Sequence, residues 1–319
     1  MVTLTAPPGS TQRERQERLP FLQRPGTREG IAGYVFLLPW IFGLAVLTIG
    51  PMFYSLYLSF TRYDLLSPPE WIGLGNYETM FTADPRYWKS VRVTLIYVVV
   101  FVPLLQVLSM LLALLLNKNM KFLTGYRALF YLPSLMGASV AVAALWRQVW
   151  GADGLINTAL GYLGITGVGS WVGDPGRALG TIIALSLWAF GSTMIIFLAG
   201  LRQVPRELLE AAEVDGASTV RRFFSVVLPL MTPLVFFNLL MGTINAFQAF
   251  TGAYVVSSGT GGPVDSTLFY TLYLYEKGFR FLQMGYASAM AWVLLVVLAV
   301  FTAILFATSR TWVVYGDES

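Results

Sequence analysis

The chain of 319 residues contains no cysteine and no histidine. Without cysteine it can form no disulfide and can carry no thiol nucleophile. Without either residue it also lacks the ligands that hold most zinc ions and haem groups. These two absences exclude disulfide-stapled domains, thiol enzymes and the usual zinc and haem proteins.

Charge is also scarce, because only 12% of the residues are charged whereas 56% are hydrophobic. A soluble domain carries about 25% charged residues, so this chain cannot cover a globule of its size with a water-compatible surface. Every Lys, Arg, Asp and Glu falls outside six apolar segments. These segments are residues 31–60, 93–116, 128–146, 178–201, 230–256 and 284–309.

Each apolar segment is 19 to 30 residues long, and about 20 apolar residues cross a bilayer as a helix. A charge at mid-membrane costs roughly 2.5–3.5 kcal/mol, so its absence from all six segments is meaningful. The sequence therefore predicts an all-α, polytopic membrane protein with six transmembrane helices. A membrane barrel would show shorter segments of alternating polarity. The first segment is too long for a signal peptide, and its Pro39 and Pro51 predict a kinked or tilted helix.

The distribution of positive charge predicts the orientation in the membrane. If the amino terminus is cytoplasmic, thirteen of the 21 Lys and Arg fall in inner segments and eight in outer loops. The short inner loop shows this bias most clearly, with Lys118, Lys121 and Arg127 and no acidic residue. Both termini are therefore predicted to be cytoplasmic. A net charge of +4 needs no nucleic acid to explain it.

The predicted organisation is one membrane domain without a soluble domain of its own. Residues 1–30 are predicted to be a basic cytoplasmic tail near the lipid headgroups, and residues 310–319 a second cytoplasmic tail. Residues 31–309 are predicted to form the membrane domain, which includes a cytoplasmic loop at 205–229. The outer loops are too small for a core of their own.

Residues 205–229 have a helical pattern of their own. Pro205 suits a first helical position, Gly216 can end the helix, and Ser218 can cap a second one. At about 100° per residue the first helix has an acidic and an apolar face. The two faces are formed by Glu207, Glu210 and Glu213 and by Leu208, Leu209 and Ala212. The pattern predicts a helix–turn–helix between two membrane spans.

An ordinary amphipathic connector that lies on the lipid headgroups is the alternative for this segment. Such a helix normally has a polar face rich in Lys and Arg. The first helix of this segment is acidic instead, so anionic lipids would repel it. A protruding acidic helix is better suited to a protein partner.

The same segment resembles the EAA loop of bacterial ABC-importer permeases. Glu210-Ala211-Ala212 is followed after three residues by Gly216 and after nine more by Val226-x-Leu228-Pro229. In that family the last element begins with Ile, and only Val226 departs from the pattern. Other stretches are similar to the first permease subunit of carbohydrate-uptake importers, and the resemblance covers residues 30–310. These stretches are Tyr131-Leu132-Pro133-Ser134, Gly154-Leu155-Ile156-Asn157, Gly262-Pro263 and Gly285-Tyr286-Ala287-Ser288-Ala289.

The resemblance implies a permease subunit whose loop docks into a separate cytoplasmic ATPase. Motif position assigns Glu210, Ala211, Ala212 and Gly216 to the coupling surface. Supporting contacts are expected, on weaker grounds, from Glu207, Glu213, Asp215, Arg221 and Arg222. The chain has no phosphate-binding loop of the G-x-x-x-x-G-K-[ST] type, so ATP and Mg²⁺ are expected on the partner and no cofactor on this chain.

The resemblance also implies the rest of the assembly. The expected partners are a second permease subunit, two copies of the ATPase, an extracytoplasmic solute-binding protein and membrane lipid. The expected location is the bacterial plasma membrane. The transported solute would be a sugar or a sugar-like molecule.

No charge lies within the six apolar segments, so a neutral solute would have to be held by amides, hydroxyls and aromatic rings. In the fifth segment Asn238, Asn245 and Gln248 fall within about 80° around the helix, so they share a face. Their alternative role is hydrogen bonding between helices, worth about 0.6 kcal/mol each. The fourth segment offers weaker candidates, namely Ser186, Trp188 and Thr193.

Two other classes of protein stay open at this point. An ion-coupled secondary transporter usually carries buried ionisable residues and repeated halves, and the sequence shows neither. A membrane enzyme without His or Cys would depend on loop carboxylates such as Asp64, Asp84 and Asp174, which form no recognisable paired motif. The sequence therefore favours a transport subunit that is not itself an enzyme.

Overall fold

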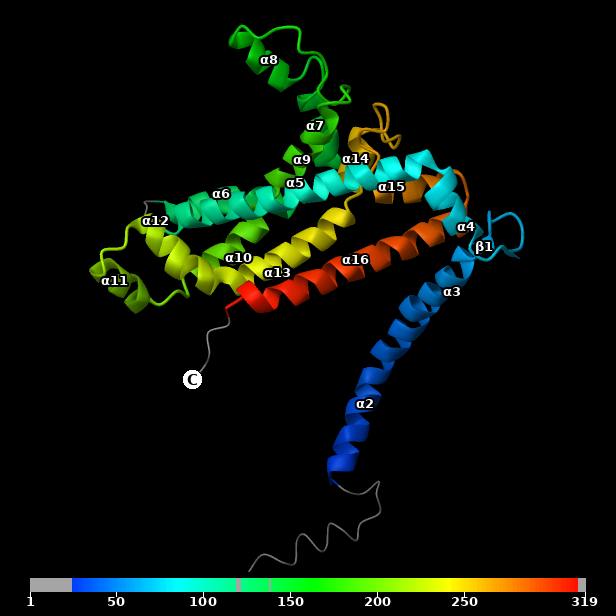
Figure 1. Cartoon of the computed structure of the whole chain (residues 1–319), viewed down its shortest axis with the longest axis horizontal. Helices are drawn as coiled ribbons and strands as arrows, with labels where there is room; N and C mark the ends of the chain where they lie inside the picture. The colour runs from blue at the N-terminus through cyan, green and yellow to red at the C-terminus, as the bar shows by residue number, and fades with distance from the viewer. Residues whose placement is uncertain (1–24, 119–121, 138, 315–319) are drawn as a thin grey trace, which may run out of the picture. The chain divides into compact units, whose positions relative to one another are not determined.

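The structure, a computed structural model, describes residues 25–118, 122–137 and 139–314, with the backbone alone for residues 25–32 (Figure 1). Most of the predicted basic tail, Lys121 and residues 315–319 therefore lie outside the described residues. The regular secondary structure of the described residues is helical apart from one antiparallel hairpin of β1 (Thr61–Arg62) and β2 (Glu70–Trp71). The predicted all-α class is confirmed.

The chain forms two compact units, Met1–Tyr57 and Leu58–Ser319. The described part of the first unit is one long helical run. It consists of α2 (Pro25–Leu44), a π-helical turn η2 (Ala45–Ile49) and α3 (Gly50–Ser59), whose last residues belong to the second unit. The π-helical turn ends two residues before Pro51, which can donate no backbone hydrogen bond. The run begins six residues before the predicted start at residue 31.

The second unit holds the remaining elements, which follow one another along the chain. They are α4 (Gly75–Glu78), η3 (Thr79–Ala83), α5 (Pro85–Leu116), α6 (Leu123–Met136), α7 (Val140–Val149), α8 (Leu155–Tyr162), α9 (Ala178–Trp188), α10 (Gly191–Leu201), α11 (Arg206–Val214), α12 (Thr219–Arg222), η4 (Phe223–Val227), α13 (Leu228–Phe247), α14 (Thr251–Val256), α15 (Tyr270–Tyr275), η5 (Glu276–Arg280) and α16 (Met284–Trp312).

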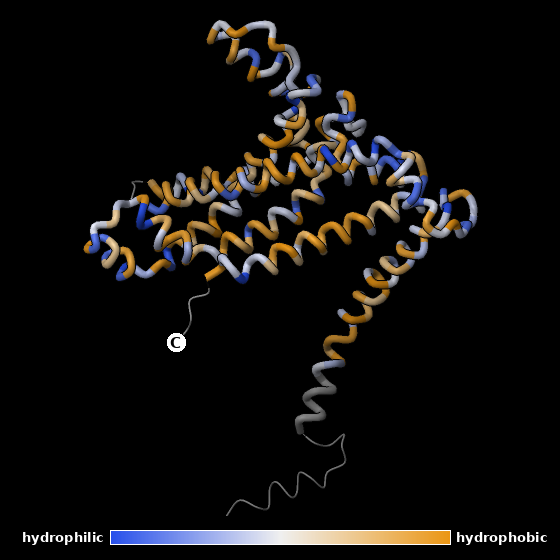
Figure 2. The backbone as a smooth tube through the Cα atoms, in the orientation of Figure 1, coloured by the Kyte–Doolittle hydropathy of each residue, from blue (hydrophilic) through white to orange (hydrophobic). Residues whose placement is uncertain are grey.

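Four helical runs are long and apolar enough to cross a membrane, and the number rises to six if each of two bent helix pairs is one span. The four runs are Gly33–Ser59, Pro85–Leu116, Thr219–Val256 and Met284–Trp312. The bent pairs are α6 with α7 and α9 with α10, which turn by 104° and 47°. Figure 2 shows the hydrophobic residues along these helices and the hydrophilic ones near their ends.

Helix α5 is the centre of the second unit. It packs against α9, α10, α13 and α15, and α13 also packs against α16. One hydrophobic cluster contains Tyr97, Phe101 and Phe269, and another contains Met194, Phe197 and Met231. Because α5 is 32 residues long, it measures about 48 Å and exceeds a hydrocarbon core of about 30 Å. Part of this helix must therefore lie outside the hydrocarbon core.

Gly191, the first residue of α10 after the bend, makes a close helix contact. A Cβ atom at Gly191 would lie 2.8 Å from the carbonyl oxygen of Phe130 and from the Cα of Tyr131. The missing side chain lets α10 approach the backbone of α6 at the Tyr131–Ser134 stretch.

Replacing Gly191 with alanine should lower the free energy of unfolding by about 1–3 kcal/mol, because backbone atoms cannot move aside for the new methyl group. Thermal unfolding of the purified protein in mild detergent would measure this change. Gly180→Ala, in α9, is the matched control, since nothing lies within 4 Å of its added Cβ and the variant should be neutral or slightly more stable. Equal stability of the two variants would contradict the close contact at Gly191.

Candidate functional site

The 205–229 loop forms two short helices, α11 and α12, at one end of the second unit (Figure 1). Helix α11 begins after Pro205 and contains no buried residue. Its apolar residues Leu208 and Val214 are 46% and 88% exposed. Since apolar side chains of a helix normally pack against something, α11 presents a surface without an intramolecular partner among the described residues.

A tight turn at Gly216 ends α11. The amide of Ala217 donates to the carbonyl of Ala212 at 2.9 Å, and the amide of Gly216 donates to that of Glu213 at 3.0 Å. This pair of bonds is the Schellman motif, which needs a left-handed residue just beyond the helix. Gly216 has φ +74° and no atom within 4 Å of an added Cβ. Glycine is therefore favoured there for its backbone conformation and not for space.

The turn is fastened to the helix that follows it. Ser218 caps α12, because its hydroxyl accepts from the amide of Arg221 at 3.4 Å. The guanidinium of Arg222 pairs with the carboxylate of Glu213 and also donates to the hydroxyl of Thr219. These contacts hold α11 on α12.

No break separates α12 from the membrane helix after it. The helical run continues through η4 into α13, as one of the runs long enough to cross a membrane. A force that passes from α11 to α12 would therefore reach α13 through continuous helix.

The structure distributes the predicted coupling residues between two roles. Glu213 and Arg222 hold the loop together. The side chains exposed on its surface are Glu207, Glu210, Ala211, Asp215 and Arg221, whereas Ala212 is half-buried. The exposed surface is acidic with two apolar side chains, which fits a partner with a basic rim and an apolar groove.

The three predicted pathway amides of α13 do not share one environment. Asn238 is buried, and its amide nitrogen has no hydrogen-bond partner among the described residues. Asn245 and Gln248 are exposed. Together with the exposed Phe237 and Met241 they form a stripe along α13, in which two amides are accessible and Asn238 is not. The expected shared face is thus divided between the interior and the surface.

The candidates in the fourth segment are half-buried. Ser186 is occupied internally, because its hydroxyl donates to the carbonyl of Ile182 and accepts from the hydroxyl of Tyr97 at 2.8 Å. Trp188 packs near Trp146, with ring centroids 6.3 Å apart. Thr193 lies in α10, beyond the bend. Packing and helix contacts explain Ser186 and Trp188.

Gln106 of α5 is a buried amide that the sequence pattern did not single out. Both polar atoms of its side chain are buried and have no partner among the described residues. Its amide nitrogen faces Gly242 of α13, where an added Cβ would lie 3.7 Å away. It is the only side-chain amide in the 93–116 segment. A single amide in an uncharged segment could have marked Gln106 as a candidate from the sequence alone.

A second missed feature is a group of charges at the end of the second unit that carries β1 and α4. We call it the rim cluster. It consists of Asp84, Arg86, Asp265, Glu276, Lys277 and Arg280, with the phenols of Tyr273 and Tyr286. Three acidic and three basic groups balance one another, so their charges are compensated within the protein.

Arg86 and Asp84 are the centres of the rim cluster. Arg86 binds Asp265 through two nitrogens, at 3.1 and 2.7 Å, and Glu276 at 3.1 Å. Asp84 caps α5 with one oxygen, and its other oxygen accepts from Tyr273 at 2.6 Å and from Tyr286 at 2.7 Å. The cluster therefore ties the start of α5 to elements about 180–200 residues further along the chain.

The hairpin packs against the same end of the unit, where Gly285 leaves space for it. A Cβ atom there would lie 2.1 Å from the carbonyl oxygen of Thr61. The amide of Asn76 also donates to the carbonyls of Ser59 and Thr61, each at 2.9 Å. The Gly285–Ala289 stretch recognised in the sequence thus has a structural cause, since its first residue gives space and its second, Tyr286, reaches Asp84. Sequence spacing alone could not pair residues so far apart.

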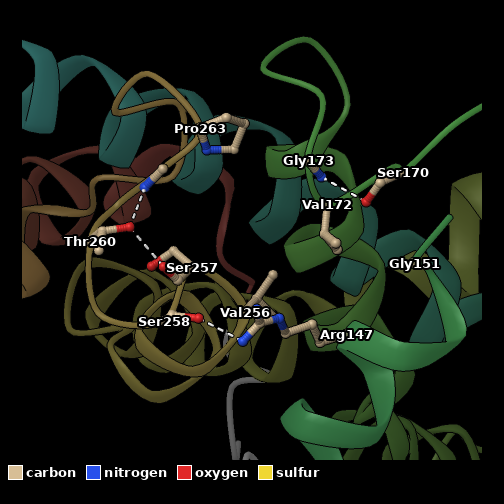
Figure 3. A pocket seen from close by; sticks show the side chains of 11 residues that line it. Arg147, Gly151, Ser170, Val172, Gly173, Val256, Ser257, Ser258, Thr260 and Pro263 are labelled. Carbon is tan, nitrogen blue, oxygen red and sulfur yellow. Dashed lines mark hydrogen bonds between the residues drawn. The ribbon is translucent and has the colours of Figure 1, made fainter.

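A pocket of about 450 Å³ opens between the end of α7 and the loop after α14 (Figure 3). One side consists of Gly151, Ser170, Val172 and Gly173, and the other of Val256, Ser257, Ser258, Thr260, Gly262 and Pro263. Arg147 reaches from α7 and donates to the hydroxyl of Ser258 at 2.6 Å. The volume lies in the range of about 300–1,000 Å³ that is usual for small-molecule sites.

Comparison with known proteins gives consistent similarities. The family model described as "Binding-protein-dependent transport system inner membrane component" matches residues 79–312. The probable ABC transporter permease protein YesP of Bacillus subtilis is 52% identical, over 91% of this chain and 94% of that protein. The lactose transport system permease protein LacF of Rhizobium radiobacter is 32% identical, over 88% of this chain and 94% of that protein.

A solved structure has the same fold as this chain. It is a bacterial alginate ABC transporter in complex with an alginate pentasaccharide-bound periplasmic protein. The similarity covers 91% of this chain and 97% of the matched chain, with a TM-score of 0.74 and 20% sequence identity.

The rim cluster should make the free energy of unfolding depend on pH in the acidic range. Burial, the largest single effect, raises the pKa of Asp84, but hydrogen bonds from Tyr273 and Tyr286 and the charge of Lys277 outweigh it, so the pKa lies below its ordinary value. A lowered pKa means that the folded state favours the carboxylate, so this stabilisation is present above the unfolded-state pKa of about 3.9 and is lost as pH falls through the folded-state value.

Asp84→Asn should therefore be less stable at pH 7, by about 1–2 kcal/mol, and should lose less further stability than the parent protein on acidification. Thermal unfolding between pH 7 and pH 3 would measure both effects. Asp153→Asn, an exposed carboxylate without an ion pair among the described residues, is the control. An acid dependence that is the same in Asp84→Asn and the parent would contradict the role of Asp84.

Proposed function

Because this chain belongs to the family of binding-protein-dependent transport system inner membrane components, we propose that it imports a sugar or sugar-like solute and is driven through its 205–229 loop by a separate ATPase. The observation that carries this proposal is α11, a helix whose acidic and apolar side chains are exposed and which a tight turn joins to α12, the start of a membrane-length helical run. The structure gives that surface no intramolecular role among the residues described.

The proposed mechanism begins with a movement of the ATPase that α11 follows. Gly216 and the Glu213–Arg222 pair keep the angle between α11 and α12 fixed. The movement then passes through η4 into α13, which packs against both α5 and α16. At the opposite end the rim cluster fastens α5 to α16 and so provides a fixed frame against which α13 can tilt. Alternating access of the solute site would follow from this tilt.

ATP and Mg²⁺ would be bound by the ATPase, since this sequence contains no phosphate-binding loop. This chain would contribute the docking helix and half of the solute pathway. Two ATPase copies would engage two such helices, one from each permease subunit.

A second permease subunit would complete the pathway. The exposed stripe of α13, with Asn245 and Gln248, is the surface where amides could meet the hydroxyl groups of a sugar. LacF is named for lactose transport, and this name supports a saccharide as the solute. An extracytoplasmic binding protein would deliver it, as the periplasmic protein in the alginate transporter complex suggests.

The two competing functions find less support. The charges of the rim cluster lie at the end of the unit and are already paired, so they offer no free carboxylate for ion coupling. The three loop carboxylates considered for catalysis also have structural partners. Asp64 closes its own turn with Ser67, Asp84 belongs to the rim cluster, and Asp174 pairs with Arg177.

Affinity purification of the native complex in mild detergent tests the proposal as a whole. An ATPase, a second permease and a solute-binding protein should co-purify with this chain. A chain that purifies without an ATPase, and whose uptake survives ATPase inactivation but not an uncoupler, would instead be an ion-coupled transporter.

Glu210→Lys tests the docking surface. The side chain of Glu210 is exposed, so the variant should insert and unfold like the parent protein. It should nevertheless reduce co-purification of the ATPase and lower solute uptake by about tenfold, which corresponds to about 1.4 kcal/mol of lost binding. The matched control is Glu78→Lys, the same exchange at an exposed site on α4. Full uptake with Glu210→Lys, or an equal loss in the control, would contradict the assignment.

Asn245→Leu tests the pathway. Because the side chain is exposed on α13, assembly with the ATPase should be retained while uptake falls by about threefold to tenfold, as expected for the loss of one or two hydrogen bonds to the solute. Uptake by proteoliposomes of the complete complex would measure this loss. Asn238→Leu changes a buried residue whose amide nitrogen has no partner among the described residues, so it should leave both stability and uptake nearly unchanged. A reversal of these two outcomes would move the pathway to the opposite face of α13.

A further inference from the structure

The pocket between α7 and the loop after α14 has an uncompensated positive charge. Arg147 lines it and donates to Ser258. Within the described part of the chain, no carboxylate lies within 4.0 Å of its guanidinium. A guanidinium has five N–H donors and no acceptor, so most of its hydrogen-bonding capacity is unused.

Other arginines in the predicted outer loops show the contrast. Arg86 pairs with Asp265 and Glu276, and Arg177 pairs with Asp174. The protein thus supplies acidic partners to these cations but not to Arg147. Arg92 also has no acidic partner within the described chain, but it does not line this pocket.

The rest of the pocket wall is already ordered by its own hydrogen bonds. Ser257 donates to the carbonyl of Ala253 and accepts from the amide of Gly261 at 3.1 Å. Across the pocket, the amide of Gly173 donates to the hydroxyl of Ser170 at 3.1 Å (Figure 3). These internal bonds shape the two walls and leave the guanidinium as the group with spare donors.

We propose that this pocket binds the anionic group of an acidic saccharide, with Arg147 as the residue that recognises the charge. A planar guanidinium matches the two oxygens of a carboxylate and forms charge-assisted hydrogen bonds to them. The small polar side chains of the wall suit the hydroxyl groups next to that carboxylate. The inference rests on the proposed function for the nature of the solute, and it assigns an acidic saccharide where that function requires only a sugar-like one.

Direct binding to the purified chain tests the proposal, with D-glucuronate and D-glucose as a pair of probes that differ in one carboxylate. Saturation-transfer NMR on the full-length protein in nanodiscs of zwitterionic lipid would detect even weak binding. Glucuronate should bind at least about fivefold more tightly than glucose, because its charged hydrogen bonds are stronger than neutral ones. Equal binding of the two probes would overturn the proposal.

Variants identify the residue. Arg147→Gln should remove the preference for glucuronate without changing thermal unfolding, whereas Arg147→Lys should retain part of it. Arg92→Gln, which removes another unpaired cation, should leave the preference unchanged. A glucuronate preference that persists in Arg147→Gln, or that disappears equally in Arg92→Gln, would overturn the assignment to this pocket.

A carboxylate of the solute-binding protein is the other source of the same chemistry. Co-purification of the solute-binding protein with Arg147→Gln distinguishes the solute from the binding protein as the source of the anion. The amount of binding protein that co-purifies should be unchanged if the solute supplies the anion. Reduced co-purification together with no glucuronate binding by the parent would place the anion on the binding protein and overturn the solute site. The NMR assay needs no ATPase, so the two proposals fail in different ways. If only the pocket assignment is wrong, glucuronate does not bind but the ATPase still co-purifies. If only the proposed function is wrong, the ATPase does not co-purify but glucuronate still binds.

Discussion

The constraint on which this structure depends is that charge has no place in the hydrocarbon core of a membrane. All charged residues are therefore displaced to the ends of the helices and into the connections between them. The two ends of the second unit use these charges in opposite ways. At one end the six charges of the rim cluster compensate one another. At the other end α11 exposes Glu207 and Glu210 to its surroundings.

This difference separates a fixed part of the protein from a part that can follow a partner. The rim cluster joins the start of α5, the loop at Asp265 and the start of α16 by hydrogen bonds to buried or half-buried groups. Such networks become costly to break when they are removed from water. Within the 205–229 loop, α11 has no buried residue, and local bonds fix its position on α12. Because these local bonds hold α11 on α12, the two helices can move together as one body.

The sequence predicts features that depend on local pattern. The acidic face of α11, the turn at Gly216 and the cap at Ser218 all follow from residues within one or two helical turns, and the structure has each of them. The rim cluster could not be predicted, because Asp84 and Tyr286 are 202 residues apart and no periodicity relates them. The division of the amides on α13 was equally hidden, since it depends on which face α5 covers.

Two glycines show that motif resemblance and physical cause are distinct. Gly216 has open space around it but a positive φ, so any residue that tolerates the left-handed conformation could take its place at some cost. Gly285 has no positive φ, yet a side chain there would collide with the backbone of β1. Gly216 sets the direction of α11, and Gly285 lets the β1–β2 hairpin pack against the end of the unit that carries the rim cluster. Both occur in stretches recognised from sequence, but only the structure tells the two reasons apart.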